Sequence, residues 1–150
     1  MSERQTGDRV AIIRREEYLP FTDQEHLFLT GDLQQPNAHP FFRDTRLEWI
    51  LCFYEAGDDG VAHWHPDVTE YEMVLEGEVG YFEPATGETN WFRPGDFSAI
   101  PAGVCVQRIV RERSRTVAIK VPSNAERVVC SGCTRDCASR VNSYRQESEN

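Results

Sequence analysis

The sequence predicts an all-β domain. Between Leu47 and Pro122, short runs of β-branched and aromatic residues alternate with turn signals, and no stretch shows a 3.6-residue period with helix caps. The run LEWILCFY, Leu47–Tyr54, is nearly continuous in apolarity, which is typical of a strand buried on both faces. Many short strands at close spacing indicate a β-sandwich or a small barrel.

Further elements follow in order along the chain. A turn (AGDDG, 56–60) follows the first strand, and residues 79–94 predict a hairpin with Gly87 in its turn. A turn and a short strand come next at 93–103, and VQRIV (106–110) and RTVAIKVP (115–122) predict two more strands. Upstream, TDQEHLFLTG (22–31) predicts a helical turn, with Thr22 and Glu25 as a capping box.

The domain organisation follows from the same pattern. We expect one domain over residues 1–122, with an irregular N-terminal segment and its core at about 47–122. From residue 123 to residue 150 the chain turns polar and contains cysteines, so this part is predicted to be a short tail with a frayed end, SYRQESEN.

Net charge and hydropathy indicate which kinds of binding partner to expect. The formal net charge of −9 over 150 residues disfavours nucleic acid and anionic membrane surfaces, because both require a cationic face. No apolar run is long enough to span a bilayer, and the first ten residues, MSERQTGDRV, lack the apolar core of a signal peptide. We therefore expect a cytoplasmic protein that binds neither nucleic acid nor membrane.

Two of the four histidines lie two residues apart, in HWHPDVTEYE. Side chains alternate along a strand, so His63 and His65 point the same way and can reach one metal ion. A returning strand after the turn at Pro66 offers Glu70 and Glu72 on one face. Two imidazoles and one carboxylate suit Zn²⁺, or a facial triad for Fe²⁺.

Two longer patterns surround these residues. Residues 57–77 match G-x5-H-x-H-x4-E-x6-G, and residues 95–103 match G-x5-P-x-G. In both motifs the sequence resembles the cupin superfamily, over about 47–121. The resemblance implies a double-stranded β-helix barrel, a relative of the jelly roll, with one metal in its mouth held by His63, His65 and Glu70.

The sequence departs from the cupin pattern at one expected ligand. Val106 stands where cupins usually supply a further histidine, and valine cannot bind a metal. Gln107 would face away from the metal by strand alternation unless a bulge shifts the register. We expect three protein ligands and open coordination positions, against the alternative of a degenerate cupin that has lost its metal.

Other groups are predicted around this metal. Glu72 is a candidate general acid or base, since partial burial would raise its pKa; it could instead pair with an interior arginine. Arg108 is a candidate for that partner, or for a clamp on a substrate carboxylate. Lys120 is expected to be exposed rather than interior. Trp64 and Tyr71, on the opposite face, are expected to be core or dimer contacts, and we expect a homodimer.

The cysteines fall into two groups. Cys52 and Cys105 lie in apolar surroundings, so we expect reduced core thiols. The cluster C-x2-C-x3-C at Cys130, Cys133 and Cys137 is a candidate second, structural Zn²⁺ site that would need one ligand from elsewhere. A redox-active pair and unbound tail thiols are the alternatives.

These observations favour a metal-dependent enzyme acting on a small polar metabolite. Iron would indicate O₂-dependent oxidation, and zinc would indicate isomerisation, rearrangement or lyase chemistry. One similarity is to zinc cupins that form N–N bonds, which are often fused to another enzyme domain. A non-catalytic cupin that binds a sugar or other small molecule and a purely structural dimerisation barrel remain open, because a fold by itself does not fix a function.

Overall fold

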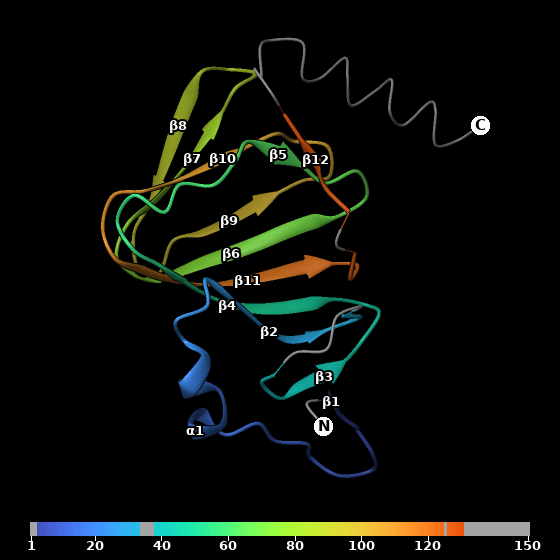
Figure 1. The fold of residues 1–150 in the computed structure, drawn as a ribbon. Coiled ribbons are helices and arrows are strands. Elements are labelled where there is room, and N and C mark those ends of the chain that lie inside the picture. Colours follow the sequence, from blue (N-terminus) through green and yellow to red (C-terminus); the bar gives the residue numbers. More distant parts are fainter. Residues whose placement is uncertain (1–2, 34–37, 125, 131–150) are drawn as a thin grey trace, which may run out of the picture.

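A computed structural model describes residues 3–33, 38–124 and 126–130 of the chain. Its strands form three sheets (Figure 1). A seven-stranded sheet has the order β1-β3-β2-β4-β11-β6-β9, a three-stranded sheet has the order β10-β7-β8, and β12 pairs with β5. The predicted all-β class is confirmed. Among the strands of the described residues, backbone pairing does not close these sheets into one continuous barrel.

The element bounds are as follows. The N-terminal part comprises β1 (Glu3–Arg4), α1 (Arg15–Tyr18), the 3₁₀ helix η1 (Leu19–Phe21), β2 (His26–Gly31), β3 (Phe41–Arg43) and β4 (Glu48–Tyr54). The middle part comprises β5 (His63–Trp64), β6 (Thr69–Glu76), β7 (Val79–Glu83), β8 (Glu88–Phe92) and β9 (Phe97–Ile100). The last part comprises β10 (Gln107–Val110), β11 (Ser114–Val121) and β12 (Val128–Val129).

Strand alternation builds the core. In β4 every second residue from Glu48 to Tyr54 is buried, and the residues between are half-buried, so this strand is not buried on both faces as predicted. Antiparallel pairing of β4 and β6 with β11 brings their inward residues together. The resulting apolar cluster joins the large sheet to the three-stranded one through Ile50, Cys52, Tyr54, Val74, Val79, Val110 and Ala118.

The predicted helical turn at 22–31 is wrong. The short helices end at Phe21, and the Thr22 hydroxyl donates to the Leu19 carbonyl at the end of η1. From His26 the chain forms β2, which pairs with β4. A local capping pattern cannot compete here with a full strand partner, because the pairing satisfies backbone groups along the whole segment.

The hairpin of β7 and β8 is confirmed, with Gly87 in its turn at φ +75°. The glycines of the two sequence motifs, Gly57, Gly77, Gly95 and Gly103, all have positive φ values between 82° and 90°. Glycine adopts this backbone region without steric cost. The spacing of the motif glycines therefore marks the positions of the turns between strands.

Part of the predicted polar tail belongs to the fold. Strand β12 pairs antiparallel with β5, placing Val128 opposite Trp64 and Val129 opposite His63. Cys133, Cys137 and the predicted frayed end lie outside the described residues.

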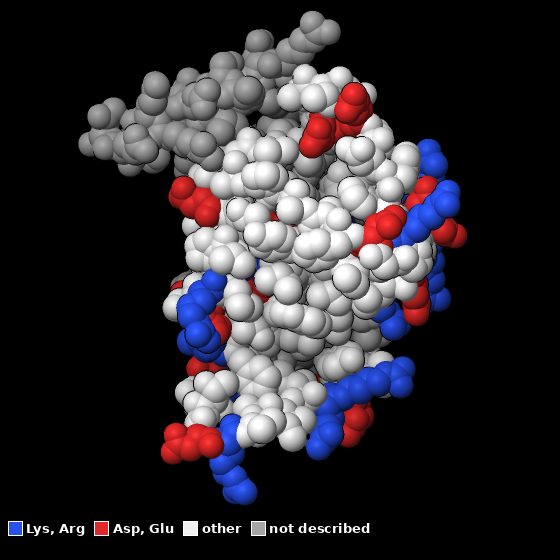
Figure 2. Space-filling view, turned by 180° about the vertical axis from the view of Figure 1, so that it is seen from behind, with Lys and Arg blue, Asp and Glu red and all other residues white. Residues whose placement is uncertain are grey.

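Two further features concern the charge of the surface and the length of the helices. On the face shown in Figure 2, acidic and basic side chains are interspersed and the centre carries mostly uncharged residues, so this face has no continuous basic surface. None of the described helices has the length and apolarity to cross a membrane.

Candidate functional site

A cavity of about 850 Å³ lies between the sheets, and the predicted histidines line it. His63, His65 and Glu70 all contribute to its wall, together with inward residues of β4 and β11. The side chain of Trp64, between the histidines, is buried in a small cluster with Cys105. The alternation expected from H-x-H is therefore confirmed, with Trp64 as a core contact.

Both imidazoles have a defined tautomer. The Nδ1 atom of His63 lies 2.8 Å from the Val61 carbonyl oxygen, and that of His65 lies 2.8 Å from the Glu126 carbonyl oxygen. A carbonyl only accepts, so each Nδ1 carries the proton and each Nε2 presents a lone pair. Burial lowers the pKa of both histidines, which keeps them neutral at neutral pH.

His65 Nε2 is a buried atom without a hydrogen-bond partner among the described residues. It lies 3.7 Å from Glu70 Oε2, too far for a hydrogen bond. The His63 ring stands nearly perpendicular to the His65 ring, with 5.2 Å between their centroids. A buried, unpaired lone pair beside a carboxylate is costly unless a cation fills the gap.

The donor set at this point suits a divalent metal. Neutral imidazole nitrogens and one carboxylate are ligands of Zn²⁺ and Fe²⁺, and backbone carbonyls that accept from Nδ1 are the usual outer partners of metal-binding histidines. Among the residues that the structure describes, no three His, Cys, Asp or Glu side chains converge tightly enough to form a ready metal cluster. His63, His65 and Glu70 therefore line one wall of the cavity, but their side chains do not converge on one point.

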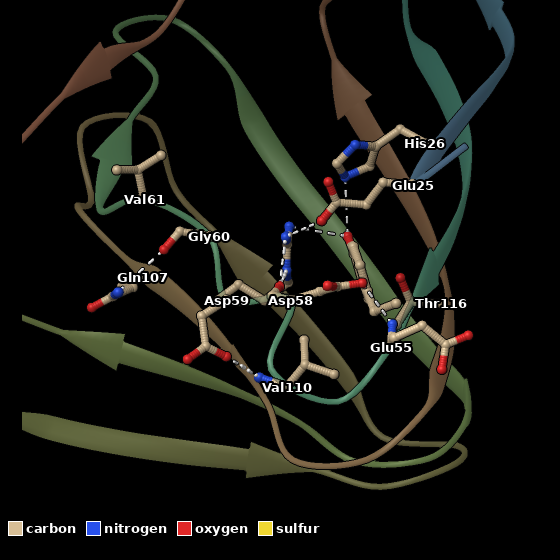
Figure 3. Close-up of polar contacts among 12 residues, drawn as sticks. Glu25, His26, Glu55, Asp58, Asp59, Gly60, Val61, Gln107, Val110 and Thr116 are labelled. Atoms are coloured by element: carbon tan, nitrogen blue, oxygen red, sulfur yellow. Dashed lines mark hydrogen bonds and ion pairs between the residues drawn. The ribbon is translucent and has the colours of Figure 1, made fainter. Parts of the chain in front are cut away.

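The orientations of Val106 and Gln107 agree with those predicted from the sequence. Val106 is buried, lines the cavity and exchanges two backbone hydrogen bonds of 3.0 Å with His63. The Gln107 amide instead donates to the Gly60 carbonyl at 3.1 Å (Figure 3).

Glu72 is fully inside the protein, with 4 % of its surface exposed. Tyr81 donates to its Oε1 at 2.5 Å and Thr116 donates to its Oε2 at 3.1 Å. Burial, followed by the nearby Glu70 charge, raises the pKa of Glu72 to about 7. Tyr81 lines the cavity, whereas Glu72 lies behind it. The Tyr81 hydroxyl therefore connects the Glu72 carboxyl group to the cavity.

Arg108 lines the cavity but does not hydrogen-bond to Glu72. Its guanidinium donates to Glu25 Oε1 at 2.5 Å, to the Asp58 carbonyl at 3.0 Å and to the Tyr54 hydroxyl at 3.3 Å. It also lies 4.0 Å from the centroid of the Tyr54 ring. The guanidinium of Arg108 is thus already paired with the Glu25 carboxylate.

Sequence reasoning missed several lining residues. Lys120, expected to be exposed, is only 17 % exposed and lies 4.0 Å from Glu48 Oε2. Burial raises the pKa of Glu48, against the effect of Lys120. His26 lies 3.2 Å from the Tyr54 hydroxyl. The alternation within Glu48–Tyr54 would have indicated Glu48 and Tyr54, and the Val79–Tyr81 alternation would have indicated Tyr81; His26 needed the β2–β4 register.

Comparison with known proteins places this geometry in a fold class. Neither protein-family models nor curated protein sequences give a match. A solved structure of an uncharacterised double-stranded β-helix protein from Klebsiella pneumoniae matches with a TM-score of 0.60 and 16% identity, over 82% of this chain and 99% of that one. The DMSP lyase DddQ from Ruegeria pomeroyi matches with a TM-score of 0.56 and 21% identity, over 84% of this chain and 59% of that one.

A third similar structure is KdgF from Halomonas, with a TM-score of 0.50 and 20% identity, over 54% of this chain and 74% of that one. The chain therefore has the double-stranded β-helix fold of the cupins, as its two motifs imply. At this level of identity the likeness extends to the fold alone.

Proposed function

We propose that this protein is a metal-dependent enzyme of cupin fold that acts on a small polar metabolite. One observation carries the proposal: the buried Nε2 of His65 has no hydrogen-bond partner among the described residues and lies beside Glu70, in a cavity that His63 also lines. His63, His65 and Glu70 would hold the ion. A bound Zn²⁺ or Fe²⁺ would polarise a substrate oxygen at this wall.

The chain's own residues supply the proton chemistry. Tyr81 faces the cavity and donates to Glu72, whose pKa is raised to about 7. In this proposal the Tyr81 oxygen takes a proton from the substrate while its own proton passes to Glu72. Glu72, with a pKa near neutrality, is suited to accept and return that proton. Glu72 thus acts through Tyr81 rather than by touching the substrate.

Arg108 would orient an anionic group of the substrate. Its guanidinium is fixed by the Tyr54 ring and the Asp58 carbonyl, and its remaining partner, Glu25, is the more exposed member of the ion pair. A substrate carboxylate would displace Glu25 and keep the charge-assisted bond. A lyase of the same fold, DddQ, supports the view that this scaffold accommodates enzyme chemistry.

Metal content tests the first step of this proposal. We expect protein purified without added metal, then equilibrated with Zn²⁺ or Fe²⁺ and desalted, to retain about one ion per chain by elemental analysis. His65→Ala, His63→Ala and Glu70→Ala should each lower the retained metal at least tenfold, because each removes one of only three ligands.

The matched control is His26→Gln, which changes an imidazole in the same cavity that bonds to Tyr54 instead of facing Glu70. This variant should retain the metal of the parent protein. Full metal content in His65→Ala and Glu70→Ala would refute the proposed ligand set.

A further inference from the structure

Two cysteines that are far apart in the sequence flank the same short strand. On one side of β5, β12 pairs with Trp64, and the backbone N–H of Cys130 donates to the Ala62 carbonyl at 2.8 Å. On the other side, His63 exchanges two backbone hydrogen bonds of 3.0 Å with Val106, the residue after Cys105. The backbone register therefore fixes both cysteines relative to β5.

Their side chains meet over this strand. The two Sγ atoms lie 2.9 Å apart, and both residues are thiols in the structure. Trp64 and Cys105 form a buried cluster against which Ala62, Val128 and Cys130 pack. Cys105 is buried and Cys130 is partly exposed, so the contact lies at the edge of this cluster, where a small disulfide can approach Cys130.

We propose that Cys105 and Cys130 are a disulfide-forming pair, which links the two segments that flank β5. A low-molecular-weight disulfide such as oxidised glutathione is the oxidant: one thiolate attacks it, one glutathione thiol leaves, and the second cysteine displaces the other. The two protein thiols become one S–S bond, and one oxidised glutathione becomes two reduced molecules.

The cross-link has a structural consequence near the cavity. Glu126, whose carbonyl accepts the Nδ1 proton of His65, lies four residues before Cys130. A bond from Cys130 to Cys105 anchors this segment to the body of the fold and holds that carbonyl against His65. The proposed pair stands independently of the metal site proposed in the cavity, because neither cysteine belongs to the ligand set of His63, His65 and Glu70.

Thiol mapping of the full-length chain tests the pair. Reduced protein would be equilibrated with oxidised glutathione, unfolded in the presence of N-ethylmaleimide, digested and analysed by mass spectrometry. We expect two of the five thiols to escape alkylation and a cross-linked peptide joining Cys105 to Cys130. Five alkylated thiols at every glutathione ratio, or a bond that uses Cys133 or Cys137 in place of Cys130, would overturn the proposal.

Variants sharpen the assignment. Cys133→Ser and Cys137→Ser come from the same cysteine cluster and should leave the cross-link intact, whereas Cys105→Ser and Cys130→Ser should abolish it. Oxidation should raise the thermal midpoint of the parent protein and leave that of the last two variants unchanged. The parent protein supplies the mapping result even if a variant folds poorly.

A thiolate metal site is the competing outcome. Reduced parent protein would be equilibrated with Zn²⁺, and its zinc content compared with that of Cys105→Ser and Cys130→Ser. We expect no zinc to depend on these thiols. One equivalent of zinc lost in both variants would overturn the disulfide and assign the pair to a metal site instead.

Discussion

At the residue scale, Glu72 is a buried carboxyl group supported by two hydroxyl donors. Tyr81 on β7 and Thr116 on β11 each donate to one of its oxygens. A buried carboxyl without such donors would lose its solvation without compensation, which costs more than an ordinary hydrogen bond contributes. The position of Glu72 in the core therefore depends on both hydroxyls.

Removing either donor should destabilise the protein. Thr116→Val keeps the shape of the side chain, and Tyr81→Phe keeps the ring, so each variant removes mainly one hydroxyl. We expect each to lower the free energy of unfolding by about 1–3 kcal/mol, measured by urea denaturation at neutral pH.

The control is the same pair of substitutions in a Glu72→Leu background, where no oxygen needs a donor. The loss caused by Thr116→Val should shrink there, and the difference gives the coupling energy between the two side chains. Equal losses in both backgrounds would contradict the assigned role of the hydroxyls.

At the scale of the element, the turn between β6 and β7 depends on one glycine. Gly77 has a φ of +82°, and a Cβ atom placed on it would lie 2.3 Å from the Arg113 carbonyl oxygen and 2.3 Å from the Ser114 hydroxyl oxygen. The first of these is backbone of the loop leading into β11, so the clash cannot be relieved by a side-chain rotation. Gly77, the last residue of the first motif, therefore fixes both a turn and a close approach between β6–β7 and the loop before β11.

Gly77→Ala should accordingly be costly. We expect a loss of about 3 kcal/mol or more in the free energy of unfolding, since the unfavourable φ and the overpacking add. Gly87→Ala is the matched control: its φ is +75° but no atom lies within 4 Å of the added Cβ. That variant should lose only about 1–2 kcal/mol. Equal losses by chemical denaturation would show that the close approach at Gly77 contributes nothing.

At the scale of the whole molecule, the pH dependence of stability includes a contribution from His26. Burial, and then the charge of Arg108, lowers the pKa of His26 from 6.5 to about 4. Between these values the unfolded chain binds a proton that the folded chain does not. The free energy of unfolding therefore rises with pH from about 4 to 6.5, and the His26 contribution is constant above that.

His26→Gln removes the titrating group and keeps a side chain that can bond to Tyr54. We expect the stability difference between parent and variant to change by about 3 kcal/mol between pH 4 and pH 7, because one pKa unit corresponds to about 1.4 kcal/mol. Urea denaturation at closely spaced pH values measures this difference. A difference that stays constant over the range would contradict the buried, neutral state of His26.

Much of the fold and part of the site could be predicted from local sequence. Apolar runs and turn residues marked the strands from β4 to β11, and the alternation in H-x-H placed His63 and His65 on one cavity wall. Lys120 was misjudged, because its burial depends on Glu48 in a partner strand. The homodimer and the cytoplasmic location stay predictions.

The sequence by itself determined the strand pattern, the turns at its motif glycines and the spacing of His63, His65 and Glu70, because these depend on residues near one another in the chain. Only the tertiary structure decided which groups surround them. Sheet register brings Tyr81 and Thr116 to Glu72, Glu25 to Arg108, and Cys130 to Cys105. Such pairings join residues that are distant in sequence, so no local pattern encodes them.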